Sequence, residues 1–473
     1  MAVFSVIKLS ETNNHHRLDS EFYHPIYLEN KRRLTNLKTP LFFLKQVSNY
    51  ITNGHTPRYA DLTIGEVYFL TAEDILDFIV NFETSKRITK EDSYKVLRRT
   101  ILQENDLLIT IKGKIGNAAV VYKLKGETNI NQDVARIIIK KSIGERKINP
   151  YFIAAFINSK FGRLQVEQLA TSQINPFLGL GNLKQIVIPL LSEKFQNKIE
   201  DVIKKALKLF YDSYFIFSQA ENLLLEELGL KDFKPKYKKT YTAKLSDAFS
   251  AHRIDAEYFQ PAYEEVIEKI KNYKNGFVSL LKSVENVKPD FDPTKYLDKI
   301  FSYVELADID SSIGVIHSVN EIRGEEAPSR ARRMLREGDV IVSSVEGSLE
   351  KVALVDKEHD SCLASTGFFQ FRPLDILPEV LLVLSKTIVL QSQLKKRCSG
   401  TILTAVPKES LRDIIIPLLP LSTQQKIASL VQQSHEARRK AKELLEIAKR
   451  AVEIAIEKNE EEAMDYISKF STE

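Results

Sequence analysis

The sequence predicts an α+β protein with two repeated α/β domains separated by two long antiparallel coiled-coil helices, related by pseudo-two-fold symmetry. Three observations support this fold class. One order of residue motifs is written twice along the 473-residue chain. Each copy contains short β-rich runs followed by a helical stretch, and each copy ends in a long segment with heptad-spaced apolar residues. We expect the repeated domains at residues 1–190 and 241–418, and the long helices at 191–240 and 419–473.

The internal repeat extends over nearly the whole chain. Residues 16–27 (HRLDSEFYHPIY) recur as residues 252–263 (HRIDAEYFQPAY). Because the later landmarks keep their order while their spacing changes by a few residues, they indicate one folding unit with small loop insertions and deletions. The stretches between landmarks share little, which favours one scaffold carrying two different binding surfaces. The other recurring segments are 69–75 with 303–309, 102–106 with 335–339, 183–190 with 411–418, and 196–199 with 424–427.

Strand and helix patterns inside each copy predict an α+β domain. Short runs rich in β-formers are separated by Gly and Asn turns. A helical stretch follows in each copy, and each stretch opens with a proline, which suits the first helical turn. The strand runs are 107–111, 118–122, 135–139, 340–345 and 352–355, and the helical stretches are 150–169 and 378–397.

Two long helices follow the domains, each with apolar residues in a four-three spacing that predicts a coiled-coil seam. The first should end near Gly229, and Ser422 with Gln425 suggests a capping box at the start of the second. Packing of each helix on its own domain alone is the alternative to pairing. The first seam is Phe195, Ile199, Val202, Ala206, Leu209, Ile216, Ala220 and Leu223, interrupted at Ser213. The second is Ile427, Leu430, Ala437, Ala441, Leu444, Ala448, Ala451 and Ala455, interrupted at Ser434.

Composition allows nucleic-acid binding without requiring it. There are 68 basic and 63 acidic residues, so the net charge is +5, and a basic surface would have to be local. No apolar run is long enough to span a bilayer and residues 1–10 do not resemble a signal peptide, so we expect a cytoplasmic protein without membrane contact. The two cysteines and eight histidines lack metal-ligand spacing, so we expect neither a disulfide nor a metal site.

Sequence motifs for catalysis are incomplete, which predicts a non-catalytic chain without its own cofactor. The nearest approach to the Asn/Asp-Pro-Pro-Tyr/Phe motif of adenine methyltransferases is residues 175–177 (NPF), which lack the second proline. Residues 113–116 (GKIG) are no phosphate-binding loop and fit a β-hairpin turn. Residues 289–290 (PD) lack the partners of a nuclease motif, and turn chemistry explains them.

Residues 416–428 (IPLLPLSTQQKIA) resemble the segment that joins a target recognition domain to the following helix in type I restriction-modification specificity subunits. Residues 53–57 (NGHTP) look like the Gly-x-Thr-Pro element that opens many such domains, although the second copy lacks it. Residues 365–368 (STGF) look like a strand motif found late in them. With the repeat order, the resemblance covers nearly the whole chain.

The resemblance implies a non-catalytic specificity subunit with two target recognition domains, one for each half of a bipartite double-stranded DNA target. The paired helices would hold the two domains at a fixed separation, so that helix length would set the unread spacer. Expected partners are DNA, two modification (methyltransferase) subunits and two restriction (endonuclease/translocase) subunits. S-adenosylmethionine, ATP and Mg²⁺ would bind to those partner subunits.

Two alternatives differ in partner or in ligand. The chain could serve another multi-subunit methylase or defence system, such as a type IIB-like enzyme, which neighbouring genes would reveal. It could instead be a repeat scaffold that binds only proteins. The scaffold would show no salt-dependent affinity for DNA.

DNA-contacting side chains are expected in the loops between the repeated segments. Phosphate contacts require Lys or Arg, and base readout requires side chains that reach the groove edges. In the first domain the candidates are Arg58, Tyr59, Lys112, Lys114, Asn131, Gln132, Gln173 and Asn175. In the second they are Arg330, Arg332, Arg333, Arg336, Ser344, Glu346, Ser348, Lys395, Lys396, Arg397 and Thr401.

The repeated His-Arg-x-Asp segments have a different expected role. Both copies carry them, at residues 16–19 and 252–255, whereas residues that read different DNA sequences should diverge. We therefore assign these segments to a structural role or to contact with a modification subunit.

Overall fold

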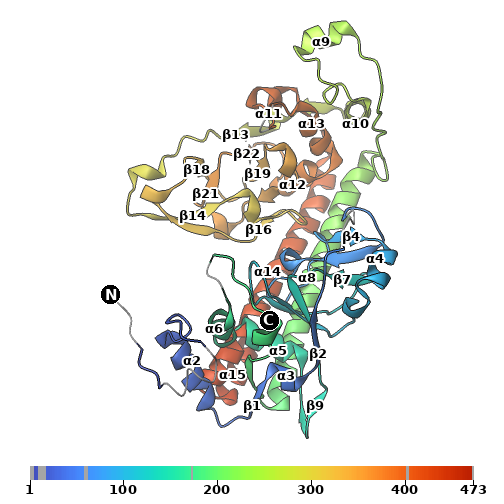
Figure 1. Cartoon of the computed structure of the whole chain (residues 1–473). Coiled ribbons are helices and arrows are strands. Elements are labelled where there is room, and N and C mark those ends of the chain that lie inside the picture. The colour runs from blue at the N-terminus through green and yellow to red at the C-terminus, as the bar shows by residue number, and fades with distance from the viewer. Residues whose placement is uncertain (1–4, 9–16, 58–61, 172–173, 401–403, 471–473) are drawn as a thin grey trace. The chain divides into compact units, whose positions relative to one another are not determined.

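The computed structural model describes residues 5–8, 17–57, 62–171, 174–400 and 404–470. The chain packs into two compact units, and Figure 1 gives the labels of their elements. Unit 1 combines Met1–Phe210 with Arg439–Glu473, and unit 2 is Tyr211–Arg438. Each long helix is therefore shared between the units. Among the described residues, no helix has both the length and the apolar character needed to cross a membrane.

Unit 1 is built on a four-stranded sheet in the order β2-β8-β5-β6, beside a three-stranded sheet in the order β4-β3-β7. Strands β3 and β7 are parallel, and all other neighbours are antiparallel. A separate ribbon pairs β1 with β11. The strands are β1 (Leu41–Phe43), β2 (Ser48–Asn53), β3 (Val67–Leu70), β4 (Lys86–Ile88), β5 (Leu107–Thr110), β6 (Ala118–Val120), β7 (Thr128–Ile130), β8 (Val134–Ile139), β9 (Ser142–Ile143), β10 (Arg146–Lys147) and β11 (Val187–Pro189). The helices are α2 (Pro25–Thr35), α3 (Leu44–Val47), α4 (Lys90–Lys95), α5 (Pro150–Asn158), α6 (Lys160–Leu169) and α7 (Leu180–Leu183).

Unit 2 repeats this topology. Its four-stranded sheet has the order β13-β22-β19-β20, and its second sheet, β17-β14-β21-β18, again contains one parallel pair, β14 with β21. The ribbon is β12 with β23. The strands are β12 (Phe277–Ser279), β13 (Val284–Asn286), β14 (Ile300–Val304), β15 (Ile309–Asp310), β16 (Val315–Ile316), β17 (Asn320–Arg323), β18 (Ala331–Met334), β19 (Val340–Ser343), β20 (Val352–Leu354), β21 (Leu363–Ser365), β22 (Phe368–Pro373) and β23 (Ile415–Pro417). The helices are α9 (Leu245–Ala251), α10 (Pro261–Lys271), α11 (Leu280–Ser283), α12 (Pro378–Lys386) and α13 (Ile388–Arg397).

Matching hydrogen bonds confirm that the two units are copies of one scaffold. In unit 1, Arg136 Nε donates to Asp106 Oδ2 at 2.7 Å, and in unit 2 Arg372 Nε donates to Asp339 Oδ1 at 2.9 Å. Asp106 and Asp339 are both buried. Each follows a turn and directly precedes a strand of the main sheet, β5 in unit 1 and β19 in unit 2. Asp106 and Asp339 belong to the recurring segments, whereas their arginine partners lie outside them.

A side-chain amide on the second helix also makes the same contacts in each unit. Gln165 accepts from Val187 N at 2.8 Å and donates to Val187 O at 2.9 Å. Gln393 makes the same pair of bonds to Ile415 N and O. These amides fasten α6 and α13 to the strands that precede the long helices.

The predicted strand runs all form strands, but each predicted helical stretch is divided. Residues 150–169 form α5 and α6, separated at Ser159, whose Oγ accepts from Gly162 N and caps α6. Residues 378–397 divide at Thr387. Both predicted stretches are helical, with one break each. The Ser159 hydroxyl competes with helix continuation as an N-cap, whereas Thr387 makes no side-chain cap hydrogen bond.

The long helices are α8 (Glu193–Glu227) and α14 (Leu421–Glu457), and α15 (Glu460–Phe470) follows the second. As predicted, α8 ends before Gly229, which has φ of 63°. The capping box at Ser422 was wrong: α14 already includes Ser422, and the Pro420 carbonyl accepts from Gln424 N at 3.0 Å.

The seam of α14 is buried as predicted except at Leu430, which is half-buried, while its neighbour Val431 is buried. The predicted seam of α8 is correct up to Ala206 and wrong beyond it, apart from Ala220. Phe210, Phe217 and Leu224 are buried there instead of Leu209, Ile216 and Leu223. After Ala206 the buried residues follow at steps of four and then three, instead of three and then four. Ser213 and Ala220 stay in the seam, and Phe210 and Phe217 enter it.

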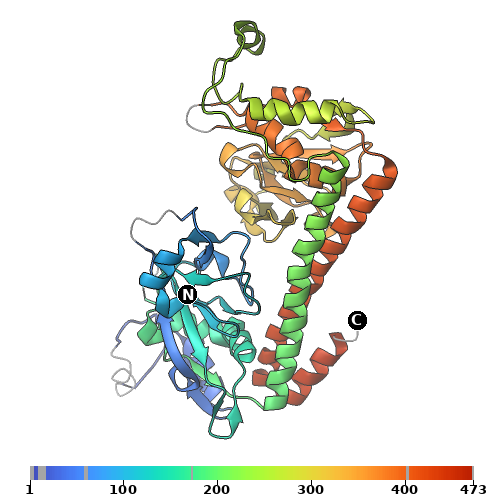
Figure 2. The same cartoon turned by 90° about the vertical axis from the view of Figure 1, so that its right-hand side faces the viewer.

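The two seam serines meet in unit 2. Ser213 and Ser434 are both fully buried, and Ser434 Oγ donates to the Ser213 carbonyl at 2.7 Å. Arg438 reaches the same point, donating from Nε to Ser213 Oγ at 3.2 Å and from Nη1 to Asp310 Oδ2 at 2.6 Å. Within each unit α8 and α14 lie side by side and run in opposite directions, as Figure 1 and Figure 2 show. The pairing of the two helices is therefore confirmed.

We expect His435 in α14 to make the stability of unit 2 depend on pH. Its ring stacks on Phe217, with centroids 6.2 Å apart, and Nε2 lies 2.9 Å from the Ile313 carbonyl. Burial lowers the pKa of His435. As the pH falls, the unfolded state therefore takes up this proton first, and the free energy of unfolding decreases once the pH passes below about 6.5.

We expect the free energy of unfolding of the wild-type protein to decrease between pH 7 and pH 5, by up to about 1.4 kcal/mol for each pH unit, and the urea midpoint to fall with it. His435→Gln keeps a donor for the Ile313 carbonyl and removes the titrating group, so its midpoint should change less. Equal pH dependence in the two proteins would contradict this assignment.

Candidate nucleic-acid interface

Four loops of unit 1 meet at one edge of its main sheet. They are the opening loop (residues 53–57), the β5–β6 hairpin loop (111–117), the turn before β8 (131–133) and the described part of the α6–α7 connection (171 and 174–178). Ile111 N donates to the Asp133 carbonyl at 2.8 Å, and Leu178 N donates to the Ile111 carbonyl at 2.9 Å. The hairpin loop thus lies between the other two segments. The structure gathers loops that the sequence predicted separately.

The opening loop is held against the turn before β8. Asn53 Nδ2 donates to the Gln132 carbonyl at 3.1 Å, and Thr56 Oγ1 donates to Gln132 Oε1 at 2.7 Å. Gly54 permits this approach, since a Cβ at that position would lie 1.9 Å from the Ile130 carbonyl oxygen. The Gly-x-Thr element therefore fixes the exposed Gln132 side chain in place.

Lys112, Lys114 and Asn175 are exposed at this edge, which is consistent with the prediction that they contact DNA. A β-bridge joins Lys112 to Phe177, so the two cations share an edge with the α6–α7 connection. The residues predicted at Arg58, Tyr59 and Gln173 lie outside the described residues. The DNA contacts themselves stay predictions.

Two apolar side chains at the same edge were not anticipated. Ile174 is 91% exposed and Phe177 is 44% exposed, on either side of Asn175 and Pro176. Exposed apolar side chains can contact the methyl group of thymine in the major groove. The sequence signal that could have identified them is their position as apolar residues in a polar loop.

Asn131 differs from the expected exposed base reader. Its side chain is 6% exposed, its Nδ2 donates to Asp133 Oδ2 at 2.9 Å, and its Oδ1 accepts from Asp133 N at 3.0 Å. The amide closes its own turn, as Asn commonly does. We correct the prediction by removing Asn131 from the set of DNA-contacting residues.

Unit 2 gathers the corresponding loops. The hairpin loop (344–351) is bonded to the segment after α13, with Glu346 N donating to the Thr404 carbonyl at 3.0 Å and Val406 N to the Ser344 carbonyl at 2.8 Å. Ser344 Oγ donates to the Gly367 carbonyl at 2.9 Å, and Thr366 N donates to the Arg330 carbonyl at 2.8 Å. The start of β18 therefore joins the same edge.

Three of the predicted arginines differ in exposure, ion pairing and position. Arg330 is exposed at this edge, and the half-exposed Arg332 is ion-paired with Asp292 at 2.6 Å. Arg336 is exposed but follows β18 in the turn before β19, at the opposite end of β19 from the hairpin loop. The structure therefore does not bring Arg336 together with the others.

Arg333 is a correction, because the structure buries it. Its side chain is 6% exposed and Nη1 donates to the Val287 carbonyl at 2.6 Å. Burial lowers the pKa of Arg333 to about 10. The alternation of side chains along β18 turns Arg333 inward and Arg332 outward.

Lys396 and Arg397 are likewise buried and structural. Lys396 forms an ion pair with Glu264, and burial together with Arg397 and Arg253 lowers the pKa of Lys396 to about 8. Arg397 donates to the Gln393 carbonyl at 3.0 Å and to the Asp413 carbonyl at 2.6 Å. Both are removed from the DNA-contacting set, and Thr401 lies outside the described residues.

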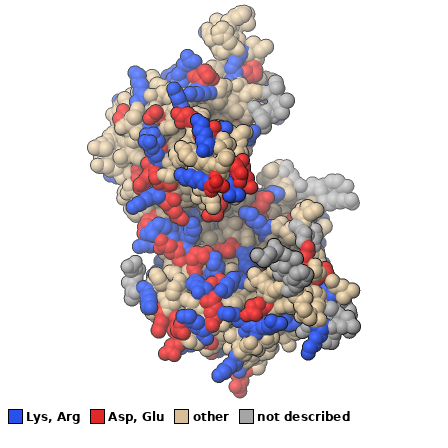
Figure 3. All heavy atoms as spheres, turned by 90° about the vertical axis from the view of Figure 1, so that its left-hand side faces the viewer, with Lys and Arg blue, Asp and Glu red and all other residues tan. Residues whose placement is uncertain are grey.

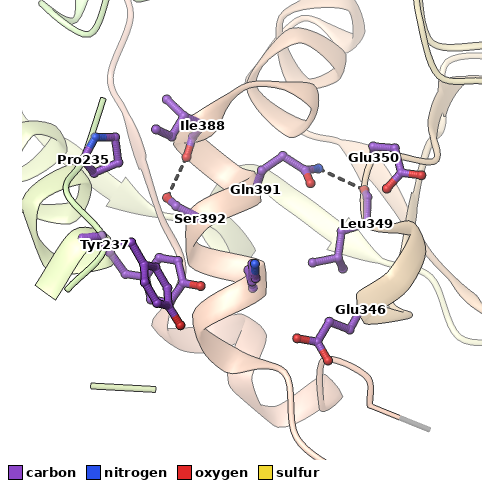
Figure 4. Close-up of a pocket in the computed structure, with 11 residues that line it drawn as sticks. Pro235, Tyr237, Glu346, Leu349, Glu350, Ile388, Gln391 and Ser392 are labelled. Atoms are coloured by element: carbon purple, nitrogen blue, oxygen red, sulfur yellow. Dashed lines mark hydrogen bonds between the residues drawn. The ribbon is translucent and has the colours of Figure 1, made fainter. Parts of the chain in front are cut away.

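Glu346 and Lys395 line one pocket of about 460 Å³ in unit 2. Figure 4 shows Glu346, Leu349 and Glu350 of the hairpin loop facing Gln391 of α13 across this pocket. Lys395 is exposed, whereas Ser348 is half-buried and lies 3.1 Å from Ser343 Oγ. The pocket thus separates the hairpin loop from the helix behind it.

The arginines of the repeated His-Arg-x-Asp segments make matching structural contacts in both units, while contact with a modification subunit stays a prediction. Arg17 Nη1 donates to the carbonyls of Gln168 and Ala170 at the end of α6, at 3.5 and 3.4 Å. Arg253 donates to the carbonyls of Arg397 and Cys398 at the end of α13, at 3.3 and 2.8 Å. Each arginine also pairs with the aspartate two residues later, at 2.6 and 2.7 Å. Cations stabilise helix C-termini in this position.

Charges of both signs are mixed on the surface. On the face drawn in Figure 3, Lys and Arg side chains are interspersed with Asp and Glu side chains. Within the described part of the chain, no group of three His, Cys, Asp or Glu side chains could hold a metal ion.

Comparison with known protein families finds a match over part of the chain. The family described as type I restriction modification DNA specificity domain matches residues 320–468. The matched residues include the hairpin loop, the segment after α13 and the helix α14. A relative, the type I restriction enzyme EcoBI specificity subunit of Escherichia coli, is 26% identical over 198 residues. The alignment covers 42% of this chain and spans 40% of that relative.

Two solved structures also resemble the chain. The type I restriction-modification S subunit from M. genitalium has 13% identity and a TM-score of 0.41, and the match covers 88% of this chain and 95% of that one. The HsdS subunit from Thermoanaerobacter tengcongensis has 14% identity and a TM-score of 0.30, with 89% and 97% covered.

Proposed function

We propose that this chain is the DNA-specificity subunit of a type I restriction-modification system and that each unit reads one half of a bipartite site in double-stranded DNA. One observation carries the proposal. The specificity-domain match contains the hairpin loop and the segment after α13, where unit 2 gathers its exposed polar side chains. Unit 1 has the same strand order in its main sheet and the same loop edge, so we extend the role to it.

Under this proposal the chain binds DNA without catalysing a reaction. Two modification subunits supply methyl transfer with S-adenosylmethionine, and two restriction subunits supply ATP-driven cleavage with Mg²⁺. The chain supplies the sequence choice through loop side chains, of which Lys112 and Lys114 contact phosphate, while Gln132 and Asn175 contact base edges. In unit 2, Arg330, Arg332, Ser344, Glu346, Ser348 and Lys395 are the corresponding set.

The test is to reconstitute the chain with its modification subunit and to map the methylated sites by sequencing. We expect one bipartite motif, no methyl transfer by the chain alone, and DNA affinity that falls steeply with salt. Methyl transfer by the purified chain would overturn the proposal. Affinity without salt dependence or sequence preference would favour a protein-binding scaffold.

Removing the hairpin cations should weaken DNA binding by the reconstituted complex. Lys112→Ala with Lys114→Ala should lower the affinity for all sequences about equally and reduce the slope of log K against log salt by about 1 for each lost phosphate contact. Lys90→Ala is the matched control, since Lys90 is exposed in α4, away from the four loops. An unchanged slope in the double variant would show that the hairpin does not contact phosphate.

A further inference from the structure

One side chain on the second helix of each unit holds the hairpin loop from behind. In unit 1, Arg163 Nη1 donates to the Ile115 carbonyl at 3.0 Å. In unit 2, Gln391 Nε2 donates to the Leu349 carbonyl at 3.0 Å, a bond drawn in Figure 4. Arg163 is the fourth residue of α6 and Gln391 is the fourth residue of α13. Equivalent positions therefore make the same contact with different side chains.

The contact in unit 1 belongs to a small network. Arg163 Nη2 is ion-paired with Asp77 and donates to Asn117 Oδ1 at 3.0 Å, at the end of the hairpin loop. Gly116, which has φ of 84°, lies so close to α6 that a Cβ would be 2.8 Å from Val166 Cγ1. The loop backbone is thus fixed on its helix side, and Lys112 and Lys114 remain exposed.

The contact in unit 2 is simpler. Gln391 Nε2 also donates to the Ser385 carbonyl at 2.6 Å, which ties the loop to the end of α12 as well as to α13. Gln391 and Leu349 line the same pocket as Glu346 and Glu350. The amide therefore ties the Leu349 end of the loop to α13 across the pocket.

We propose that Arg163 and Gln391 are positioning residues for DNA reading, each fixing the conformation of one hairpin loop without touching DNA. This inference rests on the proposed function. A loop held in its bound conformation loses less freedom on binding, and a reading side chain must be placed within a fraction of an ångström to discriminate bases. Each residue therefore controls one half-site, that of its own unit.

The decisive variants remove the donor to the loop. Gln391→Glu keeps the size of the side chain but cannot donate to the Leu349 carbonyl. Arg163→Ala removes the bond to Ile115 together with the contacts to Asp77 and Asn117, which the variants below separate. We expect selection from a randomised DNA library by the reconstituted complex to show about tenfold weaker base preference in one half-site, with the other half-site unchanged. The half-site affected should differ between the two variants.

Two controls separate positioning from general stability. Asp77→Asn removes the ion pair of Arg163 and leaves its bond to the loop, and Ser392→Ala removes a hydroxyl that donates only within α13, to the Ile388 carbonyl. Both should keep the wild-type base preference. Arg163→Gln should restore the preference lost in Arg163→Ala, because Gln391 reaches the equivalent carbonyl.

The outcomes distinguish this inference from the function on which it rests. If the wild-type complex selects no sequence, the proposed function fails. If the wild-type complex selects a motif and both Gln391→Glu and Arg163→Ala retain its full base preference, the positioning role is overturned. Loss of preference in both half-sites together, or a lowered melting temperature that accounts for the loss, would also overturn it.

Discussion

Asp106→Ala should lower the free energy of unfolding of unit 1 by about 3–5 kcal/mol. Asp106 and Arg136 form an ion pair at 2.7 Å with side chains only 5% and 8% exposed. Asp106 Oδ2 also accepts from Gln103 N at 2.7 Å, which closes the turn before β5. Removing the carboxylate leaves a guanidinium and an amide without their partner in the interior. Urea denaturation followed by circular dichroism measures the loss.

Two further variants make this prediction specific to a buried charge. Glu83→Ala breaks the pair of Lys125 with Glu83, whose side chains are 41% and 37% exposed, and should cost at most about 1 kcal/mol. Replacing both partners, with Asp106→Leu and Arg136→Met, should be less destabilising than Asp106→Ala alone, because no unpaired charge remains. A double variant less stable than the single one would refute this explanation.

Gly54→Ala should abolish reading of one half-site and destabilise unit 1 by about 1–3 kcal/mol. The added Cβ would meet the Ile130 carbonyl oxygen at 1.9 Å and the Asn131 carbonyl oxygen at 2.5 Å, and both are backbone atoms that cannot rotate away. The opening loop must therefore lift, which breaks the bond from Thr56 to Gln132. Motif mapping of the reconstituted complex and thermal melting would measure the two effects.

Gly181→Ala is the matched control in the same unit. A Cβ at Gly181 would have no atom within 4 Å, and the residue lies in the short helix α7. Alanine favours helix over glycine, so the stability and the DNA motif should both be kept. If Gly54→Ala behaved like Gly181→Ala, the close approach of the opening loop would have no functional importance.

The scaffold could be predicted because its signals are local and occur twice. The repeated motifs, the β-rich runs and the heptads each depend on short spacings, and together they gave the two-unit α+β fold. The α8 seam failed at Phe210 because two phases of the four-three spacing were both apolar there. Both phases share Ser213, so only the tertiary packing around Phe210 and Phe217 decides which phase is buried.

The candidate site was harder to predict, for reasons visible in single residues. Arg333 and Lys396 have the composition of DNA-contacting residues, yet strand alternation and helix packing turn them into the interior. Asn131 closes its own turn, which its sequence neighbours alone do not reveal. Arg163 and Gln391 carry no motif, and only the bond that each makes to a distant loop identifies them.

The division of the chain also determines the order in which the units can be completed during synthesis. Unit 2 is one continuous stretch, whereas unit 1 needs residues 439–473 as well as the N-terminal part. Glu460 Oε1 accepts a hydrogen bond from Ser192 N at 3.0 Å, and Glu457 forms an ion pair with Lys160. Unit 1 can therefore be completed only after residues 439–473 have been synthesised. We expect a premature stop codon late in the gene to destabilise the domain that is encoded at its start.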